Sequence, residues 1–161
     1  MNAIDRQIIT ILQLEGKATY AELARRVGLS QAAAHERVKK LEQRGLIRGY
    51  RAVVDPGALD LPVIAFVFVE QSAGPRRPDL PTRFAALANV VECHSVAGDE
   101  SYLLKLRARD TVELETLINE IRRIETVART RTVVGLTTWF EGRPMLPATD
   151  EPAEAGAAPQ A

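Results

Sequence analysis

The stretch from residue 19 to residue 51 constrains the fold of this chain more than any other part of the sequence. Thr19 and Glu22 have the spacing of a capping box, which predicts that a helix begins there. Gly28 is placed to end that helix, because glycine adopts the left-handed backbone conformation without a steric cost. Ser30 is then placed to cap a second helix. Two short helices joined by a tight turn are typical of the helix-turn-helix, whose second helix lies in the major groove of DNA.

The segments on either side complete a small DNA-binding unit. Apolar residues at helical spacing within residues 4–12 predict a helix before the motif. Gly45 stops the second helix of the motif, and residues 46–54 then predict a wing of two short strands that turns near Gly49. Three helices followed by such a wing predict a winged helix-turn-helix over residues 1–54. A unit of this size has a thin core and gains stability from a partner subunit.

The charge of the chain is unevenly distributed, although its formal net charge is zero. Residues 1–54 hold ten Lys and Arg against five Asp and Glu, a net of +5, whereas residues 55–161 hold eleven against sixteen, a net of −5. A basic block attracts phosphates, and an acidic remainder is repelled by them. The charge changes sign where the helix-turn-helix pattern ends, so two independent signals predict the same domain division.

Composition excludes several classes of protein and site. The chain has no apolar run long enough to span a bilayer and no basic start typical of a signal peptide, so we expect a cytoplasmic protein that does not bind membranes. The single cysteine, Cys93, excludes an intrachain disulfide. Together with His35 and His94 it shows no metal-ligand spacing. Because Cys93 and His94 are neighbours on a predicted strand, they point to opposite faces and form no catalytic pair. No metal, catalytic residue or tightly bound cofactor is therefore expected.

The second half of the chain has the pattern of an α+β domain. The turn residues of 55–61 predict a linker. The predicted strands are residues 63–69, 90–97, 101–109 and 127–139. The first of these is a continuous apolar run, as expected of a strand covered on both faces. In the third, Tyr102, Leu104, Leu106 and Ala108 alternate with Leu103, Lys105, Arg107 and Arg109, so one face is apolar.

Two helices lie between these strands. A Pro-rich loop at residues 74–81 precedes a short helix that carries Phe84, and Asp110 opens a longer helix as the first residue of another capping box. The resulting order, βαββαβ, is the ferredoxin-like split motif, predicted here for residues 62–142. Residues 143–161 are rich in Pro, Ala and Glu, a composition typical of a disordered tail.

Eight short motifs occur along the chain in a specific order and spacing. They are Ile4–Ile9, Ala21–Ala24, Val27–Ser30, Arg37–Glu42, Gly45–Tyr50, Val96–Asp99, Tyr102–Leu104 and Thr130–Thr132. In this order they resemble the Lrp/AsnC (feast/famine) family of transcription regulators, and the resemblance covers residues 3 to about 142 of this chain. It implies a homodimer built through the sheets of the C-terminal domains and assembled further into tetramers or octamers. It also implies an amino-acid effector bound between those domains.

The predicted DNA contacts lie on the second helix of the motif and on the wing. N-terminal positions of a recognition helix reach base edges. The candidates for base readout are Gln31, Ala32, Ala33, His35 and Glu36. The candidates for phosphate contact are Ser30, which is first a helix cap, and Arg37, Lys39, Lys40, Arg48 and Arg51. Tyr50 either packs against the helices or contacts the DNA backbone. Because two readout positions are alanines, we expect modest specificity that depends on DNA shape and A·T-rich flanks.

The predicted effector site is a tight turn between two strands. Its candidate residues are Gly98, Asp99, Glu100, Ser101 and Tyr102. A carboxylate pairs with the ammonium group of an amino acid, and exposed turn amides hydrogen-bond its carboxylate; the alternative is a hairpin turn with solvated acids. Ser101 stands where the family often has an acidic residue, and Glu100 can supply that charge from the adjacent position. Thr130 and Thr132 are further candidates, or simply β-branched strand residues.

Three functions remain open from the sequence. The first is a non-enzymatic regulator that binds double-stranded DNA and responds to an amino acid. The second is an enzyme similar to siroheme decarboxylases, which share the two-domain architecture; it would need histidines around a large ring, and this chain offers His35 and His94 alone. The third is an architectural DNA-binding protein that ignores small molecules.

Overall fold

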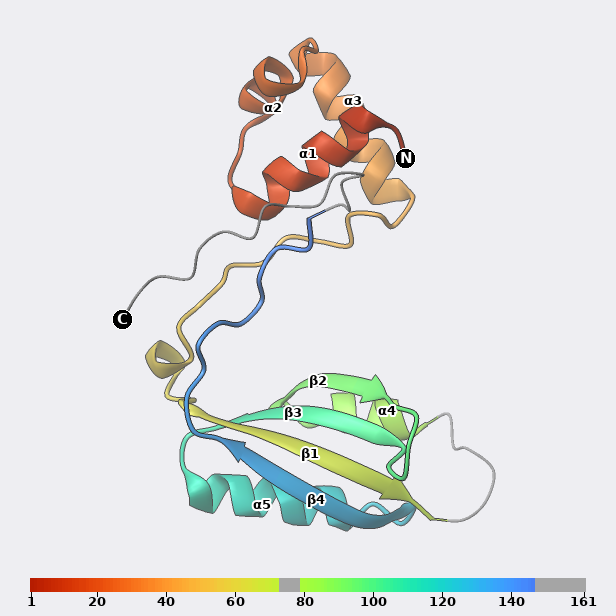
Figure 1. The fold of residues 1–161 in the computed structure, drawn as a ribbon, viewed down its shortest axis with the longest axis vertical. Helices are drawn as coiled ribbons and strands as arrows, with labels where there is room; N and C mark the ends of the chain where they lie inside the picture. Colours follow the sequence, from red (N-terminus) through yellow and green to blue (C-terminus); the bar gives the residue numbers. More distant parts are fainter. Residues whose placement is uncertain (73–78, 147–161) are drawn as a thin grey trace. The chain divides into compact units, whose positions relative to one another are not determined.

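The computed structural model describes residues 1–72 and 79–146, and these form two compact units (Figure 1). The first unit contains Met1–Ala52 together with the described residues from Phe140 onward, and the second contains Val53–Trp139. Most of the predicted Pro-rich loop at residues 74–81 and of the predicted tail at residues 143–161 lies outside the described residues. No helix in the described ranges is long and apolar enough to cross a bilayer.

The first unit is built from three helices, α1 (Ala3–Leu14), α2 (Tyr20–Val27) and α3 (Gln31–Gln43). Each begins at a side-chain cap, which is Asn2, Thr19 or Ser30 in turn, because the first backbone amides of a helix need acceptors outside it. The core of the unit consists of Ile8, Ile11, Leu23, Ala24, Ala34, Val38 and Leu41. The predicted buried side of the recognition helix is confirmed, since Ala34, Val38 and Leu41 are at most 1 % exposed.

Glycine ends α2 as predicted. Gly28 has φ of 69°, in the left-handed region, and its amide donates to the carbonyl oxygen of Ala24. A residue with a Cβ is strained in that conformation, so glycine allows the chain to turn sharply into the cap of α3.

The two predicted strands of the wing are not formed. Residues 46–54 are all described, and none of them belongs to a strand. A two-stranded hairpin is marginal unless its side chains pack on a core. Here Val53 is 91 % exposed and Tyr50 is 54 % exposed, so little packing holds a hairpin together.

The second unit is a four-stranded antiparallel sheet with the strand order β2-β3-β1-β4. Its strands are β1 (Val63–Gln71), β2 (Val90–Ser95), β3 (Tyr102–Ala108) and β4 (Val127–Gly135). The helices are a short 3-10 helix (Pro56–Leu59), α4 (Leu80–Ala85) and α5 (Thr111–Arg122). Both α4 and α5 contribute to one core against the same face of the sheet (Figure 1). The chain order β1-α4-β2-β3-α5-β4 confirms the predicted βαββαβ fold.

Among the described residues, no helix of this unit covers the other face of the sheet, which corrects the prediction that the first strand is covered on both faces. Along β1 the helix-covered residues Ala65, Val67 and Val69 are fully buried, whereas the alternate residues Phe66 and Phe68 are partly exposed. On β3 the predicted apolar face is confirmed, because Tyr102, Leu104, Leu106 and Ala108 are at most 3 % exposed. We call the face without helices the open face of the sheet.

The last strand is shorter than predicted. It ends at Gly135 instead of reaching Trp139. β1 is its neighbour, and the final pair in their register is Ile64 with Gly135, so residues 136–139 have no strand to pair with. Leu136 and Trp139 are accordingly 97 % and 89 % exposed. The predicted strands at 90–97 and 101–109 are also slightly shorter, as β2 and β3.

After β4 the described chain contributes a segment to the first unit. The side-chain amide of Gln13 on α1 donates to the carbonyl oxygen of Met145 at 2.6 Å, and the amide of Met145 donates back to Gln13 at 2.8 Å. One glutamine thus satisfies both polar groups of a single peptide residue. Met145, near the start of the predicted tail, is held in this way on α1.

Candidate DNA-binding and effector-binding sites

Local hydrogen bonds fix the starts of both α2 and α3. The amide of Thr19 donates to the Glu22 carboxylate at 2.8 Å, and the amide of Glu22 donates to the Thr19 hydroxyl at 3.2 Å, as the capping box predicts. At the start of α3 the Ser30 hydroxyl accepts from the amide of Ala33 at 3.2 Å. Ser30 is therefore a helix cap in this structure, which is its first predicted role.

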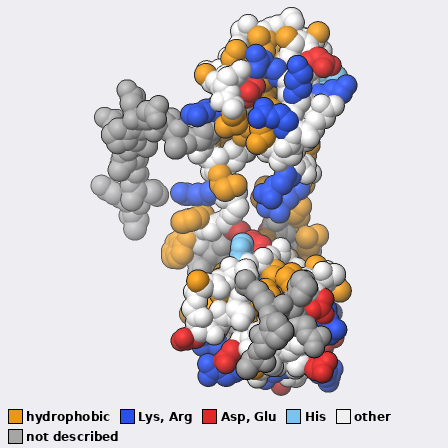
Figure 2. Space-filling model, turned by 90° about the vertical axis from the view of Figure 1, so that its right-hand side faces the viewer, with side chains coloured by type: hydrophobic (Ala, Val, Ile, Leu, Met, Phe, Trp, Pro, Cys, Tyr) orange, Lys and Arg blue, Asp and Glu red, His pale blue; other side chains and the backbone are white. Residues whose placement is uncertain are grey.

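The face of α3 turned away from the core is exposed and carries most of the predicted DNA contacts. Its exposed residues are Gln31, Ala32, His35, Glu36, Lys39 and Lys40, and Ala33 is partly exposed. Arg48 and Arg51 are exposed on the segment that follows α3. Lys and Arg side chains gather on the surface of this unit, as expected of a surface that contacts phosphates (Figure 2).

Arg37 differs from the other cations of α3 because it is tied to another helix. Its guanidinium donates to the carboxylate of Asp5 on α1 at 2.9 Å, and the Asp5 side chain is only 12 % exposed. Burial raises the pKa of Asp5, but hydrogen bonds from the amide of Asn2 and from Arg37 outweigh it and hold the pKa below its ordinary value. Asp5 thus joins the start of α1 to the middle of the recognition helix.

Tyr50 is likewise held against α3. Its hydroxyl donates to the Glu42 carboxylate at 3.0 Å. Partial burial and the hydrogen bond to Glu42 raise the pKa of Tyr50 to about 12. Of the two roles predicted for Tyr50, this contact supports packing against the helices.

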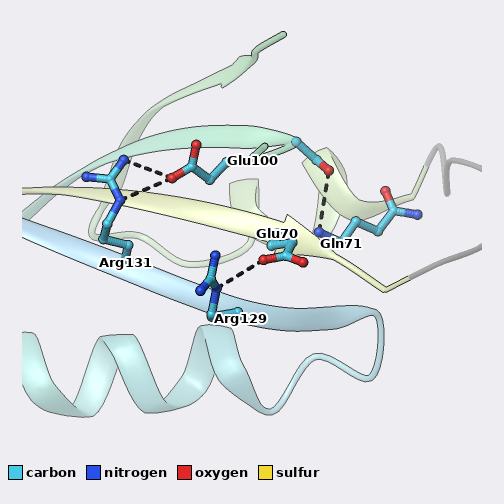
Figure 3. Close-up of polar contacts among 6 residues, drawn as sticks. Glu70, Gln71, Glu100, Arg129 and Arg131 are labelled. Carbon is cyan, nitrogen blue, oxygen red and sulfur yellow. Dashed lines mark hydrogen bonds and ion pairs between the residues drawn. The ribbon is translucent and has the colours of Figure 1, made fainter. Parts of the chain in front are cut away.

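The predicted effector turn lies at one end of the open face and is joined to β4. Gly98 has φ of 146°, which favours glycine. The carboxylate of Glu100 accepts two hydrogen bonds from the Arg131 guanidinium, at 3.1 and 2.8 Å (Figure 3). That guanidinium also lies 3.9 Å from the ring centroid of Phe68. The hydrogen bonds from Arg131 lower the pKa of Glu100.

A second ion pair lies beside the first on the same face. Arg129 on β4 donates to the Glu70 carboxylate on β1 at 3.0 Å, and the strand register places these residues opposite each other (Figure 3). Asp99 is exposed and forms no ion pair with any described residue. The turn therefore offers one free carboxylate beside a carboxylate–guanidinium pair, which is a suitable set of charges for a zwitterion.

Comparison with known proteins agrees with both parts of this arrangement. Residues 1–48 match the family described as winged helix-turn-helix DNA-binding, and residues 63–145 match the Lrp/AsnC ligand binding domain. The transcriptional regulator LrpA of Mycobacterium tuberculosis is 38 % identical over 147 residues, which is 91 % of this chain and 97 % of the relative. The chain belongs to the Lrp/AsnC family.

Other members of the family support the same assignment. The leucine-responsive regulatory protein of Haemophilus influenzae is 40 % identical over 139 residues, covering 83 % of this chain and 82 % of that protein. A solved feast or famine regulatory protein from M. tuberculosis in complex with L-methionine superposes with a TM-score of 0.85 at 38 % identity, covering 91 % of this chain and 99 % of that one. This Lrp/AsnC protein is a transcriptional regulator with a helix-turn-helix and a ligand-binding domain.

Not all predicted effector residues of this Lrp/AsnC protein come together. Tyr102 is 3 % exposed and stacks edge-on against Phe84 at 5.6 Å, within the helix-covered core. Thr130 accepts a hydrogen bond from Arg122 of α5 at 2.8 Å. The Thr132 hydroxyl is buried without a hydrogen-bond partner among the described residues. These three residues therefore lie on the face opposite Glu100 and Arg131.

The sequence-based prediction missed the residues that Glu100 contacts. Arg131 and Phe68 come from β4 and β1, and strand parity could have indicated them. Arg129 and Arg131 alternate with Thr130 and Thr132, so they share the face that the threonines do not occupy.

Cys93 and His94 point to opposite faces as predicted, since Cys93 pairs with buried Leu104 and His94 pairs with Leu103. Burial raises the pKa of the Cys93 thiol, which lowers its reactivity. In the described part of the chain, no three His, Cys, Asp or Glu side chains are grouped to hold a metal ion.

Proposed function

We propose that this protein is a homo-oligomeric regulator whose binding to double-stranded DNA responds to an amino acid. The proposal is carried by an exposed recognition helix that begins at the Ser30 cap, together with a second unit whose turn presents Asp99 beside the Glu100–Arg131 pair. The relative solved with L-methionine supports an amino acid as the ligand class. His35 and His94 lie in different units, and no contact between described residues supports the enzymatic alternative.

In this proposal α3 enters the major groove. Gln31, His35 and Glu36 contact base edges, and the two alanines approach thymine methyl groups. Lys39, Lys40, Arg48 and Arg51 contact phosphates, with Ser30 near the DNA backbone. Arg37 supports the helix through Asp5 and contributes positive charge to the same surface.

Removal of a phosphate contact tests the DNA-binding part. Lys39→Ala and Lys40→Ala should each weaken binding to all duplexes and reduce the slope of log affinity against log salt by about 1. Fluorescence anisotropy of a labelled duplex at several salt concentrations measures this slope. Arg109→Ala, an exposed cation of the other unit, is the matched control and should leave the slope unchanged. A wild-type slope in both lysine variants would contradict the proposed interface.

Amino-acid binding is tested by thermal unfolding. A ligand that binds only the native state raises its melting temperature, so one or more of the twenty amino acids should stabilise the protein. Asp99→Ala should abolish that shift, because it removes the free carboxylate for the ammonium group. Glu125→Ala, which removes an exposed acid outside the turn, serves as the control. Full amino-acid affinity in Asp99→Ala would remove the assignment of the site.

We also propose that two copies associate through the open face of the sheet. That face carries Phe66 and Phe68, and Val133 there is 47 % exposed, so association would remove apolar surface from water. Sedimentation equilibrium should find a dimer or a larger even-numbered assembly. A charged substitution, Val133→Glu, should shift that equilibrium toward the monomer, and an unchanged mass distribution would contradict this interface.

A further inference from the structure

We propose that Tyr20 is a positioning residue for base recognition: its ring holds His35 in one orientation on the exposed face of α3 and so makes His35 a selective base contact. The proposal rests on the DNA-binding function proposed above and adds a specificity-determining pair to it. Neither the helix-turn-helix pattern nor the charge of the surface requires this pair.

The contact itself is an edge-on aromatic pair between two helices. The centroids of the Tyr20 and His35 rings are 4.7 Å apart and their planes meet at 81°. This geometry is favoured because the positive edge of one ring faces the negative face of the other. Tyr20 is the first residue of α2 and follows the Thr19 capping box directly, so its backbone is fixed by hydrogen bonds that do not involve DNA.

The ring of His35 is held in place and yet remains accessible. The His35 side chain remains 51 % exposed, although one side of the imidazole packs on Tyr20 and its Nδ1 lies 3.9 Å from the Glu36 carboxylate. A neutral imidazole has one donor and one acceptor nitrogen, which suits the N7 and O6 acceptors or the amino donors of bases in the major groove. Such hydrogen bonds are directional, and a side chain already held in place loses less conformational freedom when it binds.

Two other polar side chains of α3 are also held by neighbouring segments, but neither is placed to read bases. Arg37 is paired with Asp5, and Glu42 accepts from Tyr50 near the end of the helix. The other exposed readout candidates, Gln31 and Glu36, have no side-chain partner on another element among the described residues. His35 is thus the candidate in the N-terminal half of α3 that the structure holds in advance of binding.

The neighbourhood of Tyr20 also provides a control. Tyr20, Gln31 and Tyr50 line one shallow hollow beside α3. Tyr50 contacts the recognition helix through its hydroxyl, which donates to the Glu42 carboxylate, and its ring does not stack on any described readout residue. Loss of the Tyr50 hydroxyl should therefore leave base preference intact, whereas loss of the Tyr20 ring should not.

The test is selection of binding sites from a randomised duplex by the full-length protein, followed by affinity measurements on the selected site and its single-base variants. Tyr20→Ala and His35→Ala should each reduce the preference at the same base pair of a half-site by roughly three- to tenfold. Tyr20→Phe, which keeps the ring, and Tyr50→Phe should retain the wild-type preference. Binding to non-specific duplex and its salt dependence should not change in any of these variants, since no phosphate contact is removed.

A double-mutant cycle decides whether Tyr20 acts through His35. If it does, Tyr20→Ala has no further effect on base preference in the His35→Ala background. Additive effects, or a uniform loss of affinity with unchanged base preference, would overturn the proposal. Tyr20→Leu fills the same space without an aromatic ring and replaces the alanine variant if circular dichroism shows that the latter does not fold. Wild-type protein that prefers no duplex sequence would contradict the proposed function itself, before any variant is compared.

Discussion

Replacing Phe84 with alanine should lower the free energy of unfolding of the second unit by about 3–5 kcal/mol. Phe84 is fully buried between α4 and the sheet and stacks edge-on against Tyr102. The substitution removes apolar burial and the ring contact, and leaves a cavity that a short helix such as α4 closes only in part. Such a loss is a large fraction of the total stability of a domain this size.

Urea unfolding followed by circular dichroism measures the loss, and hydrogen exchange at the amides of β1 and β3 assigns it to the second unit. Val112→Ala is the control in the same unit, because Val112 is 72 % exposed on α5 and should change stability by less than about 0.5 kcal/mol. Equal effects of the two substitutions would show that Phe84 is not in the core.

Replacing Asp5 with asparagine should destabilise the first unit by about 2 kcal/mol. The side-chain oxygen of asparagine still accepts from the amide of Asn2, so the start of α1 is preserved. The Arg37 guanidinium, however, loses its counter-ion, and the Arg37 side chain is only 33 % exposed. Faster hydrogen exchange of α3 amides reports the change. Glu15→Gln breaks an exposed pair with Arg26 in the same unit and should cost no more than about 1 kcal/mol.

The Asp5–Arg37 pair also makes the stability of the first unit depend on pH. The pKa of Asp5 is lower in the folded protein than its ordinary value of 3.8. A group with a depressed folded pKa contributes stability above its unfolded pKa, and this contribution is lost as pH falls through the folded pKa. Wild-type stability should therefore decline below about pH 4 by more than that of Asp5→Asn, which has no proton to gain at this site. Parallel acid profiles would contradict the pairing.

Much of the fold was predictable because the signals that begin and end its helices are local. The hydroxyl of Thr19 accepts from the amide of Glu22, and the Asp110 carboxylate accepts from the amide of Glu113, three residues apart in each case. The second predicted capping box is only half formed, because the Glu113 carboxylate accepts from the amide of Arg109 and not from that of Asp110. Gly28 ends α2 through its own backbone conformation. Such interactions depend on the residues within one helical turn, so their spacing in the sequence is sufficient to predict them.

Strand lengths and pairings were less predictable, because each strand depends on a neighbour that is distant in sequence. β4 stops where β1 no longer faces it, at Gly135, although apolar Leu136 and Trp139 lie beyond it. The two strands predicted after α3 have little to pack against, and neither forms in residues 46–54. Hydrophobic pattern alone cannot supply a partner strand.

The candidate sites show the same division. The exposed positions of α3 follow from helical periodicity and were predicted. The contacts that hold site residues in place join residues far apart in the sequence. Asp5 and Arg37 are 32 residues apart, and Glu100 and Arg131 are 31 residues apart. Sequence order contains no direct record of such pairs. Only the folded chain reveals that Arg37 is paired with Asp5, whereas Lys39 and Lys40 are exposed and form no ion pair with any described residue.

The hydrogen bonds between Gln13 and Met145 join residues 132 positions apart, so they form only late in synthesis on the ribosome. Residues for all three helices of the DNA-binding unit leave the ribosome early, yet the segment that binds α1 is synthesised only after the whole sheet domain. Until then the Gln13 amide on a helix near the N-terminus stays solvated. The DNA-binding unit can therefore fold early, but it is complete only when the second unit has been made. A fragment that stops after residue 52 would lack this last contact.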